Sequence, residues 1–521
     1  MKGLAPTLRL VLRRDRIQAP VWFYIFVAMA VSAVVSAKGL YPHADQLVSA
    51  AAAADRNASL VALFGPVYQP TLGALAMVKM IVLIPACLGL LTGLLVVRHT
   101  RADEDSGRRE MLGAAAIDRI AAPVAALIES VGLSLLIGAV VGVGLTVTGL
   151  PAVGAATFAA EWALVGSFFA TVGLLCAQLA EGAQGARGLF ALVLGVSYVL
   201  RALGDIQGLH RVTREPTAWT WLSPLGWAQQ MRPFAGDRWW PALLLVAGAA
   251  ILAAGSLRIA ARRDLGAGLI PVGRGRPAAA AGLRSAPALA WRLHRTQVGA
   301  WVVGFLACGV AFGGMASAIT GLASPGTADL VSRLGGGGTD LVDAFYGAIF
   351  SIMGMIAAVL AISLTIAPAG EETSGRAEYL LAGPVRRTSW FGSQSVLALL
   401  ASAVVVAAGG VGASLVADRD LVLPALGVLP AVWLLAAVGA LAAGLSARVT
   451  TVAWVALALC VLMLVADVLR LPSWVSRLSP FSHITAQPGQ TLLTGAATAM
   501  VIATVVAMGL AVVAVTRRDV G

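Results

Sequence analysis

Long apolar stretches recur along the whole chain, separated by short segments that hold most of the charged residues. Most stretches reach the roughly 20 residues that an α-helix needs to cross a bilayer. The pattern therefore predicts an all-α polytopic membrane protein with about twelve transmembrane helices. We expect these spans near residues 21–38, 72–97, 120–149, 153–180, 188–203, 239–258, 298–320, 343–368, 391–416, 422–446, 451–470 and 490–515.

The chain carries 37 Lys and Arg residues against 25 Asp and Glu residues, a net charge of +12. Most of the basic residues fall in alternate loops between the expected spans, such as 98–119 and 259–292. Cytoplasmic loops of membrane proteins carry such an excess, so the charge indicates orientation and not nucleic-acid binding. Both termini are then expected in the cytoplasm.

Two of these loops carry nearly the same sequence, 268 positions apart, at residues 103–112 and 371–380. Further matches occur in the same order along the chain: 13–22 with 292–301, 222–225 with 478–481, and 262–266 with 517–521. Collinear matches of this kind indicate an internal duplication. We expect two tandem six-helix halves in the same orientation.

The halves divide the chain into three parts. Residues 1–266 form the first half, which begins with an amphipathic helix at 4–16 that we expect to lie in the membrane interface as an elbow. Residues 267–284 are rich in Gly, Ala and Pro, a composition typical of a flexible linker. Residues 285–521 form the second half.

The repeated loops are the strongest candidates for a functional site. Gly107 and Gly375 are expected to interrupt the span helix, and Arg-x-Glu-x-Leu then starts a short amphipathic helix that Pro384 ends in the second copy. A short helix with one apolar and one charged face suits a groove in a partner protein. The alternative is an ordinary charged loop that only fixes the topology.

The second loop resembles the segment between the second and third spans of ATP-binding-cassette (ABC) type 2 permeases, whose typical pattern is Glu-x-x-Gly-x-x-Glu-x-Leu-Leu-x-x-Pro-Val-x-Arg. The first loop has Ala116 where the proline would be, so the two copies are unequal. The positions that carry the resemblance are Glu104, Gly107, Glu110, Leu112 and Arg119 in the first copy and Glu372, Gly375, Glu378, Leu380, Leu381, Pro384, Val385 and Arg387 in the second. Arg108 and Arg376, which follow the two glycines, are also expected at the docking surface.

The whole chain is similar to the fused, twelve-span actinobacterial permeases that export polyketide antibiotics or drugs. The resemblance implies the permease subunit of an ABC exporter in the bacterial cell membrane, which moves amphipathic compounds out of the cytoplasm or the inner leaflet. It also implies that the two loops are coupling helices, which dock on two copies of a separate ATPase, and that short re-entrant helices occur within 204–238 and 471–489. Membrane lipids are the other expected partners.

The sequence contains no nucleotide-binding motif of its own. A P-loop requires Gly-x-x-x-x-Gly-Lys-Ser/Thr, and none of the three lysines (Lys2, Lys38 and Lys79) has that context. The chain is therefore expected to be no enzyme and to bind no cofactor, with ATP and Mg²⁺ on the partner ATPase. The four cysteines show neither disulfide nor metal spacing.

Three charged residues fall inside expected spans: Lys79, Glu129 and Glu161. Such residues are costly in lipid, and they pair with one another, contact substrate or relay protons. Aromatic and Met side chains suit a broad apolar pocket, and the resemblance places the pathway along the second and fifth spans of each half. The candidates there are Met77, Met80, Tyr198, Phe345, Tyr346, Phe350, Met353 and Trp454.

Two other classes of protein remain open. A proton-coupled secondary transporter of the major facilitator kind also has two six-span halves, and the segment 105–109 faintly resembles its loop motif. A polytopic membrane enzyme would use the acidic segment 103–105 to bind metal, although the second copy does not repeat three carboxylates.

Overall fold

The computed structural model describes residues 2–40, 43–113, 117–209, 215–270, 278, 280, 282–322, 341–464, 474, 477–484, 486–489 and 494–518. Within these residues the regular secondary structure is helical, and one isolated β-bridge joins Ala180 and Ile270. Twelve helices or helix runs in the described part are long and apolar enough to cross a membrane. The prediction of an all-α polytopic membrane protein is confirmed.

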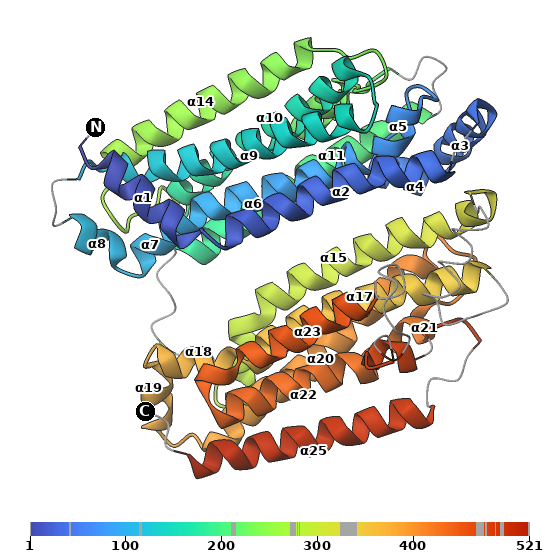
Figure 1. Ribbon diagram of the computed structural model, residues 1–521. Coiled ribbons are helices and arrows are strands. Elements are labelled where there is room, and N and C mark those ends of the chain that lie inside the picture. The colour runs from blue at the N-terminus through green and yellow to red at the C-terminus, as the bar shows by residue number, and fades with distance from the viewer. Residues whose placement is uncertain are drawn as a thin grey trace. The chain divides into compact units, whose positions relative to one another are not determined.

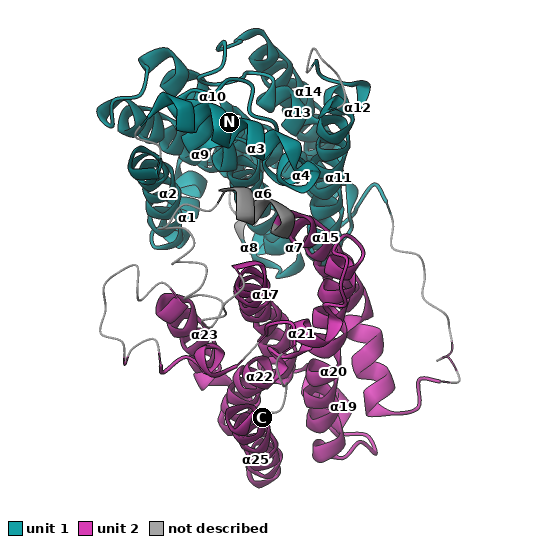
Figure 2. Cartoon of the chain, turned by 90° about the vertical axis from the view of Figure 1, so that its right-hand side faces the viewer, with its two compact units in different colours: residues 1–275 teal, residues 276–521 magenta. Residues whose placement is uncertain are grey.

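The chain divides into two compact units, residues 1–275 and residues 276–521 (Figure 2). The boundary lies within the segment expected to be a linker, residues 267–284. Each unit contributes six of the twelve candidate spans.

In unit 1 a short helix, α1, precedes the first span and is separated from it by a turn (Figure 1). The second span is a run of four short elements, because the helix is interrupted by a 3₁₀ turn and again near its end. The elements are α1 (Leu4–Arg14), α2 (Gln18–Leu40), α5 (Leu72–Met77), η1 (Val78–Met80), α6 (Leu83–His99), α7 (Arg101–Asp105), α9 (Ala121–Val147), α10 (Ala152–Leu179), α11 (Ala183–Leu209) and α14 (Trp240–Arg262).

Helix α10 lies at the centre of unit 1, where it packs against α6, α9, α11 and α14. Small residues let these helices approach closely, as is common in membranes. A Cβ placed on Gly173 of α10 would lie 2.6 Å from the carbonyl oxygen of Gly93 in α6. The crossing of α6 and α10 therefore requires glycine at position 173.

Four further short helices lie outside the spans of unit 1. Helices α3 (Ala44–Arg56) and α4 (Ala58–Phe64) follow the first span, and α12 (Ala218–Trp221) and α13 (Pro224–Gln229) precede the sixth. Helices α3 and α4 meet at a bend of 96°. A buried polar network lies here: the guanidinium of Arg201, which is fully buried, bonds Asp205 at 3.0 Å, and Gln229 donates to the same carboxylate at 3.0 Å.

Unit 2 has the same order of spans, with a core formed mainly by α17, α20 and α22. Its elements are α15 (Ala286–Leu322), α17 (Leu341–Thr365), α18 (Ala367–Thr373), α20 (Arg387–Ser414), α21 (Val422–Leu426), α22 (Leu429–Leu445), η2 (Ala447–Val449), α23 (Thr451–Leu464), η3 (Pro480–His483) and α25 (Gly495–Arg517). Of the segment 471–489, expected to be re-entrant, the structure describes residues 474, 477–484 and 486–489, which include the 3₁₀ helix η3.

The two units differ at their first helix. In unit 1 the chain turns at residues 15–17, between α1 and α2, whereas α15 of unit 2 is continuous from Ala286. The side chain of Asp15 at this turn bonds His99 and Arg98. At the offset of the loop motif these partners correspond to Ala367 and Ile366, which offer no polar group. The segment 292–301, which matches 13–22 in sequence, is therefore part of one continuous helix and not of an elbow.

Candidate functional site: the two repeated loops

Each repeated loop lies at the end of its unit's second span and includes the last short helix of that span (Figure 1). We call this end of each unit its loop end. The loop of unit 1 comprises α7 and α8 (Arg108–Gly113), and the loop of unit 2 comprises α18 and α19 (Arg376–Leu381). In both, a Ser-Gly pair separates the two short helices, Ser106-Gly107 in unit 1 and Ser374-Gly375 in unit 2.

The separating glycines adopt the same backbone conformation in both units. Gly107 has φ 70° and Gly375 has φ 71°, in the left-handed region that side chains other than glycine disfavour. The expected interruption of the helix at these two residues is therefore present. The turn directs α8 and α19 away from the axis of the preceding helix.

The first loop is held to the end of its unit's sixth span by a buried ion pair. Both carboxylate oxygens of Glu104 accept hydrogen bonds from Nη2 of Arg263 at 2.9 Å. Arg263 follows directly after α14. Only 2% of the Glu104 side chain is exposed, so this pair is strongly shielded from water.

The second loop repeats the same bond with the corresponding residues. Both oxygens of Glu372 accept from Nη2 of Arg518, at 2.7 and 2.8 Å, and Arg518 follows directly after α25. The two glutamates correspond in the loop repeat, and the two arginines correspond in the Arg-Arg-Asp repeat at the end of each half. Two separate sequence matches thus meet as one contact in each unit.

Two further arginines surround Glu104 in the first loop. Arg101, fully buried, bonds Glu104 at 2.5 Å and the carbonyl of Ala267 at 2.8 Å. Arg109 bonds Glu104 at 2.8 Å, and burial lowers the pKa of the Arg109 guanidinium although Glu104 opposes that shift. The Glu104 carboxylate therefore neutralises part of a cluster of three cations.

The neighbouring carboxylates link the first loop to other parts of unit 1. Asp103 accepts from Arg14 of α1 at 2.6 Å, and Asp105 accepts from the backbone N–H of Ala183, at the start of α11, at 2.6 Å. The loop is thereby tied to the elbow helix and the fifth span as well as to the sixth.

The second loop has fewer such links. Glu371 accepts from the indole N–H of Trp390 at 2.8 Å, and Arg387 donates to the carbonyl of Arg518 at 2.6 Å. The Glu372 side chain is 10% exposed and that of Arg518 is 22% exposed. The second loop is therefore less deeply anchored than the first.

The short helix after each glycine presents exposed side chains. Glu110 and Met111 in α8, and Glu378 and Tyr379 in α19, are exposed, with Tyr379 at 87%. Of the other positions predicted to dock a partner, Arg108, Arg119, Arg376 and Pro384 are exposed, Leu380 and Arg387 are half-buried, and the side chain of Leu112 lies outside the described residues. The loops thus combine a buried anchoring carboxylate, Glu104 or Glu372, with an exposed face.

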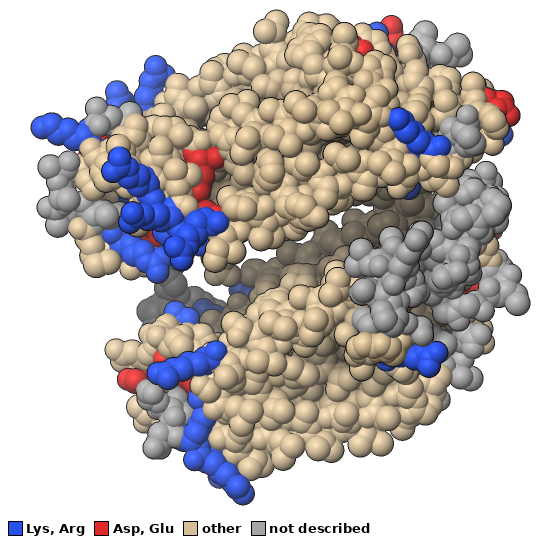
Figure 3. Space-filling model, viewed as in Figure 1, with Lys and Arg blue, Asp and Glu red and all other residues tan. Residues whose placement is uncertain are grey.

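Basic side chains gather at the loop end of each unit, with a few acidic groups among them (Figure 3). In unit 1, Arg9, Arg13 and Arg16 of the elbow region are exposed, close in sequence to the exposed Leu10 and Leu12. This combination of basic and apolar groups fits the headgroup region of a bilayer with anionic lipids.

The residues predicted to line a substrate pathway take different positions. In unit 2 they are packed inside the unit: Phe345, Tyr346, Phe350 and Met353 belong to its buried core, and the Tyr346 and Phe350 rings stack at 6.2 Å. Trp454 is 37% exposed on α23.

In unit 1 Met77 is buried, and the half-buried Met80 accepts a bond at its carbonyl from the Trp162 indole N–H at 3.0 Å. The hydroxyl of Tyr198 donates to the carbonyl of Leu63. A role of these three residues in transport, like that of the unit 2 residues, stays a prediction.

The charged residues within the spans also differ from one another. Glu161 is completely buried in α10, and neither of its oxygens has a hydrogen-bond partner among the described residues. Glu129 is buried and lies 3.4 Å from His99. Lys79 is exposed on η1, where the second span is interrupted.

The sequence patterns did not identify Arg101, Arg263, Arg518 or His99 as part of a site. Arg263 and Arg518 were visible only as a repeat at the ends of the halves, without any indication of their partners. A search for charged residues that occur twice at equivalent positions would have paired them with Glu104 and Glu372.

Comparison with known proteins supports a single family. The family model described as "Multidrug efflux system permease Rv1217c, C-terminal domain" matches residues 283–517. The chain is also 38% identical over 498 residues to the multidrug efflux system permease protein Rv1217c of Mycobacterium tuberculosis, an alignment that covers 92% of this chain and 89% of that protein. The chain therefore belongs to the family of multidrug efflux system permeases that includes Rv1217c.

Proposed function

We propose that this chain is the permease subunit of an ATP-driven ABC exporter, in which the two repeated loops transmit force from a separate ATPase. The observation that carries the proposal is the duplicated loop architecture. Both loops have a left-handed glycine, a short exposed helix and a bidentate bond from the loop glutamate to the end of the sixth span. A purely topological loop has no need to conserve that arrangement in both units.

The bonds of Glu104 to Arg263 and of Glu372 to Arg518 suggest how a displacement of each loop is transmitted to the transmembrane helices of its unit. A partner that contacts Glu110 of α8 or Glu378 of α19 would displace a loop whose other helix, α7 or α18, is bonded through its glutamate to the end of the sixth span of the same unit. Packed helices respond to such displacements as rigid elements and not by continuous deformation. The ATPase would be a separate protein, in two copies that carry ATP and Mg²⁺, since this sequence contains no P-loop.

The substrates that we propose are amphipathic compounds, such as drugs, antibiotics or lipid-like molecules. The name of the M. tuberculosis relative, a multidrug efflux system permease, supports this class. The transport direction would be out of the cytoplasm or the inner leaflet of the bacterial cell membrane, with both termini and both loops in the cytoplasm. The concentration of Lys and Arg in the segments on that side of the spans, such as 259–292, supports this orientation.

A second candidate is a secondary transporter that uses the proton gradient. One observation favours it: Glu161 is a fully buried carboxyl group in a span, without a hydrogen-bond partner among the described residues. Buried intramembrane carboxyl groups are common in proton relays. The duplicated loops have no role in that mechanism, so we rank it second.

The energy source distinguishes the two candidates. Cells that express the chain together with its ATPase would be loaded with a fluorescent amphipathic dye, and efflux would be followed after ATP depletion and, separately, after a protonophore that leaves ATP levels intact. The proposal expects efflux to stop on ATP depletion and to survive the protonophore. The opposite pattern would establish the proton-coupled candidate.

The docking role is tested by Glu110→Ala and Glu378→Ala, singly and together. A charge-assisted hydrogen bond contributes about 1.5–3 kcal/mol, so each change should weaken ATPase docking by roughly tenfold or more. Both side chains are exposed, and the folded state should therefore be unaffected. Asp45→Ala, an exposed carboxylate in α3 at the other end of unit 1, is the matched control. Unchanged dye efflux in the double variant would contradict the docking role.

A further inference from the structure

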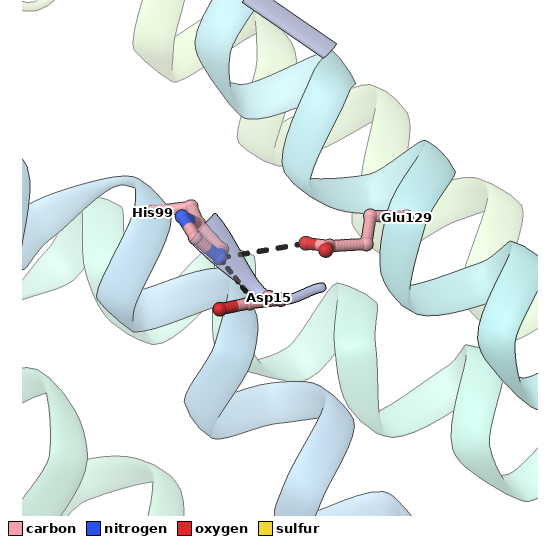
Figure 4. A group of neighbouring side chains, drawn as sticks. All are labelled: Asp15, His99 and Glu129. Carbon is pink, nitrogen blue, oxygen red and sulfur yellow. Dashed lines mark hydrogen bonds and ion pairs between the residues drawn. The ribbon is translucent and has the colours of Figure 1, made fainter. Parts of the chain in front are cut away.

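A buried group of three side chains lies where the elbow helix, the second span and the third span of unit 1 meet (Figure 4). Asp15 follows α1, His99 ends α6, and Glu129 lies in α9. The side chains point toward one another, and one ligand atom of each lies within 4.8 Å of the other two. At most 6% of any of the three residues is exposed.

The hydrogen bonds within this group are incomplete. Nε2 of His99 lies 2.6 Å from Oδ2 of Asp15 and 3.4 Å from Oε2 of Glu129. Nε2 carries one hydrogen at most, which goes to the nearer Asp15. Oε2 of Glu129 has no hydrogen-bond partner among the described residues, although it is directed into the group. A buried carboxylate without a partner is costly, and a cation between the three atoms would satisfy all of them.

The spacing suits a small divalent metal ion. In a tetrahedral zinc site with bonds of about 2.0–2.2 Å, ligand atoms lie roughly 3.3–3.6 Å apart. The distance from His99 to Glu129 already falls in this range, and the distance from His99 to Asp15 would widen by less than about 1 Å. An imidazole with two carboxylates is a ligand set for first-row transition metals, whereas Mg²⁺ and Ca²⁺ prefer oxygen ligands alone.

Two carboxylates face His99 in this group, and a guanidinium holds one of them from outside. Arg98 bonds Oδ1 of Asp15 at 2.8 Å, so Oδ2, which faces Nε2 of His99, is the oxygen that would bind a metal ion. The ion pair with Arg98 holds the Asp15 carboxylate in place at the edge of the group.

We propose that Asp15, His99 and Glu129 form a binding site for a divalent transition-metal ion of the zinc class, with water as the fourth ligand. Such an ion would fix the elbow helix to the second and third spans. His99 lies two residues before α7, so the ion would also stiffen the base of the first repeated loop. The proposal does not depend on the energy source of transport.

Unit 2 does not repeat the site. At the offsets of the internal repeat, the three positions are occupied by His294, Ala367 and Leu397. A cavity of about 230 Å³ lies at the loop end of this unit instead, lined in part by Leu289, Leu293 and Trp390. The metal site would thus be a property of the first half alone, which matches the break between α1 and α2 that occurs only there.

The test uses the full chain, purified in detergent without a polyhistidine tag and stripped of metal with a chelator. Zn²⁺ would be titrated in competition with a chelating dye, and the bound metal counted by mass spectrometry. We expect about one zinc ion per chain. Asp15→Asn, His99→Gln and Glu129→Gln should each lower the zinc affinity by on the order of 10- to 100-fold or more. This is a lower bound, because the loss of a side chain that only supports a metal ligand already has an effect of that size. His294→Gln and Glu161→Gln are matched controls and should bind zinc as the unchanged protein does.

A second measurement applies to the unchanged chain and does not require the variants to fold. Co²⁺ in place of Zn²⁺ should give the strong visible absorption of a four-coordinate site and should be displaced by Zn²⁺. The proposal is wrong if the chain binds no zinc at equimolar amounts, if the three variants that fold keep full affinity, or if Co²⁺ shows only the spectrum of the aqueous ion. In those cases the group is a buried hydrogen-bonded cluster that holds protons only.

Discussion

The two anchoring ion pairs should contribute unequally to stability, and Glu104→Gln compared with Glu372→Gln tests this. Glu104 is 2% exposed and faces three guanidinium groups, those of Arg101, Arg109 and Arg263. Glutamine has nearly the same shape but no charge, so the change leaves three cations close together without their shared anion. Breaking a buried ion pair by neutralising one partner costs about 3–5 kcal/mol.

The ion pair of Glu372 involves fewer charged groups than that of Glu104 and is more exposed to water. Its carboxylate faces one guanidinium, that of Arg518, of which 22% is exposed. Water can solvate the Arg518 guanidinium after Glu372→Gln. The loss of unfolding free energy should therefore lie near the lower end of the range of about 1.5–3 kcal/mol that a hydrogen bond to a charged group contributes. We therefore expect the first variant to lose about twice as much stability as the second, or more.

The assay is thermal unfolding of the purified full chain, followed by intrinsic tryptophan fluorescence at one fixed scan rate, because membrane proteins often unfold irreversibly. A loss of 3–5 kcal/mol corresponds to a Tm lower by on the order of 10 °C, and the Glu372 variant should fall by about 3–6 °C. Glu110→Gln, an exposed carboxyl group in the same loop, is the control and should unfold at the original temperature. Equal shifts for both glutamates, or a Glu104 shift no larger than that of Glu110, would refute the reasoning.

Two glycine substitutions give further tests of the local structure. Gly107→Ala and Gly375→Ala should each lower the free energy of unfolding by about 1–2 kcal/mol, because both residues have φ near 70°. Steric clash is not the cause, since a Cβ at either position would meet no neighbour within 4 Å. The control Gly392→Ala has the same open space within a helix and should be neutral or stabilising by up to about 1 kcal/mol in the same unfolding assay. Gly173→Ala should strongly reduce the yield of folded protein in size-exclusion chromatography, because its Cβ would lie 2.6–2.7 Å from the backbone of Gly93. A Gly173 variant with the yield of the control Gly188→Ala, whose Cβ has open space, would show that α6 and α10 do not pack as described.

Hydropathy was sufficient to predict the number and positions of the spans, because burial in lipid requires a long apolar helix whatever its neighbours are. It was less successful at the ends of helices. The second span was expected to end near residue 97, yet the helical run continues to Asp105. Arg101 makes the extension of this helical run beyond residue 97 appear unfavourable in the sequence. In the structure its charge is paired with Glu104, and its guanidinium also donates to the carbonyl of Ala267. Such compensation depends on tertiary contacts.

The candidate site was predicted in part. The repeat located both loops and their glycines, because a left-handed turn between two helices requires glycine in each copy. It did not reveal that Glu104 and Glu372 are anchors and not exposed contacts, since both lie in loops that look equally polar along their length. Asp15, His99 and Glu129 are far apart in sequence and meet only through the packing of three helices, so no spacing rule indicates them.

The central claim is that a separate ATPase drives this permease through both loops, and hydrolysis in reconstituted vesicles tests it most directly. The chain and its ATPase would be purified together and inserted into liposomes, and ATP hydrolysis would be measured with and without an amphipathic substrate. The account predicts a complex with two ATPase copies per chain, and substrate-stimulated hydrolysis that Glu110→Ala with Glu378→Ala abolishes while basal hydrolysis by the free ATPase persists. Stimulated hydrolysis that is unchanged in the double variant, or a permease that transports in vesicles without any ATPase, would contradict it.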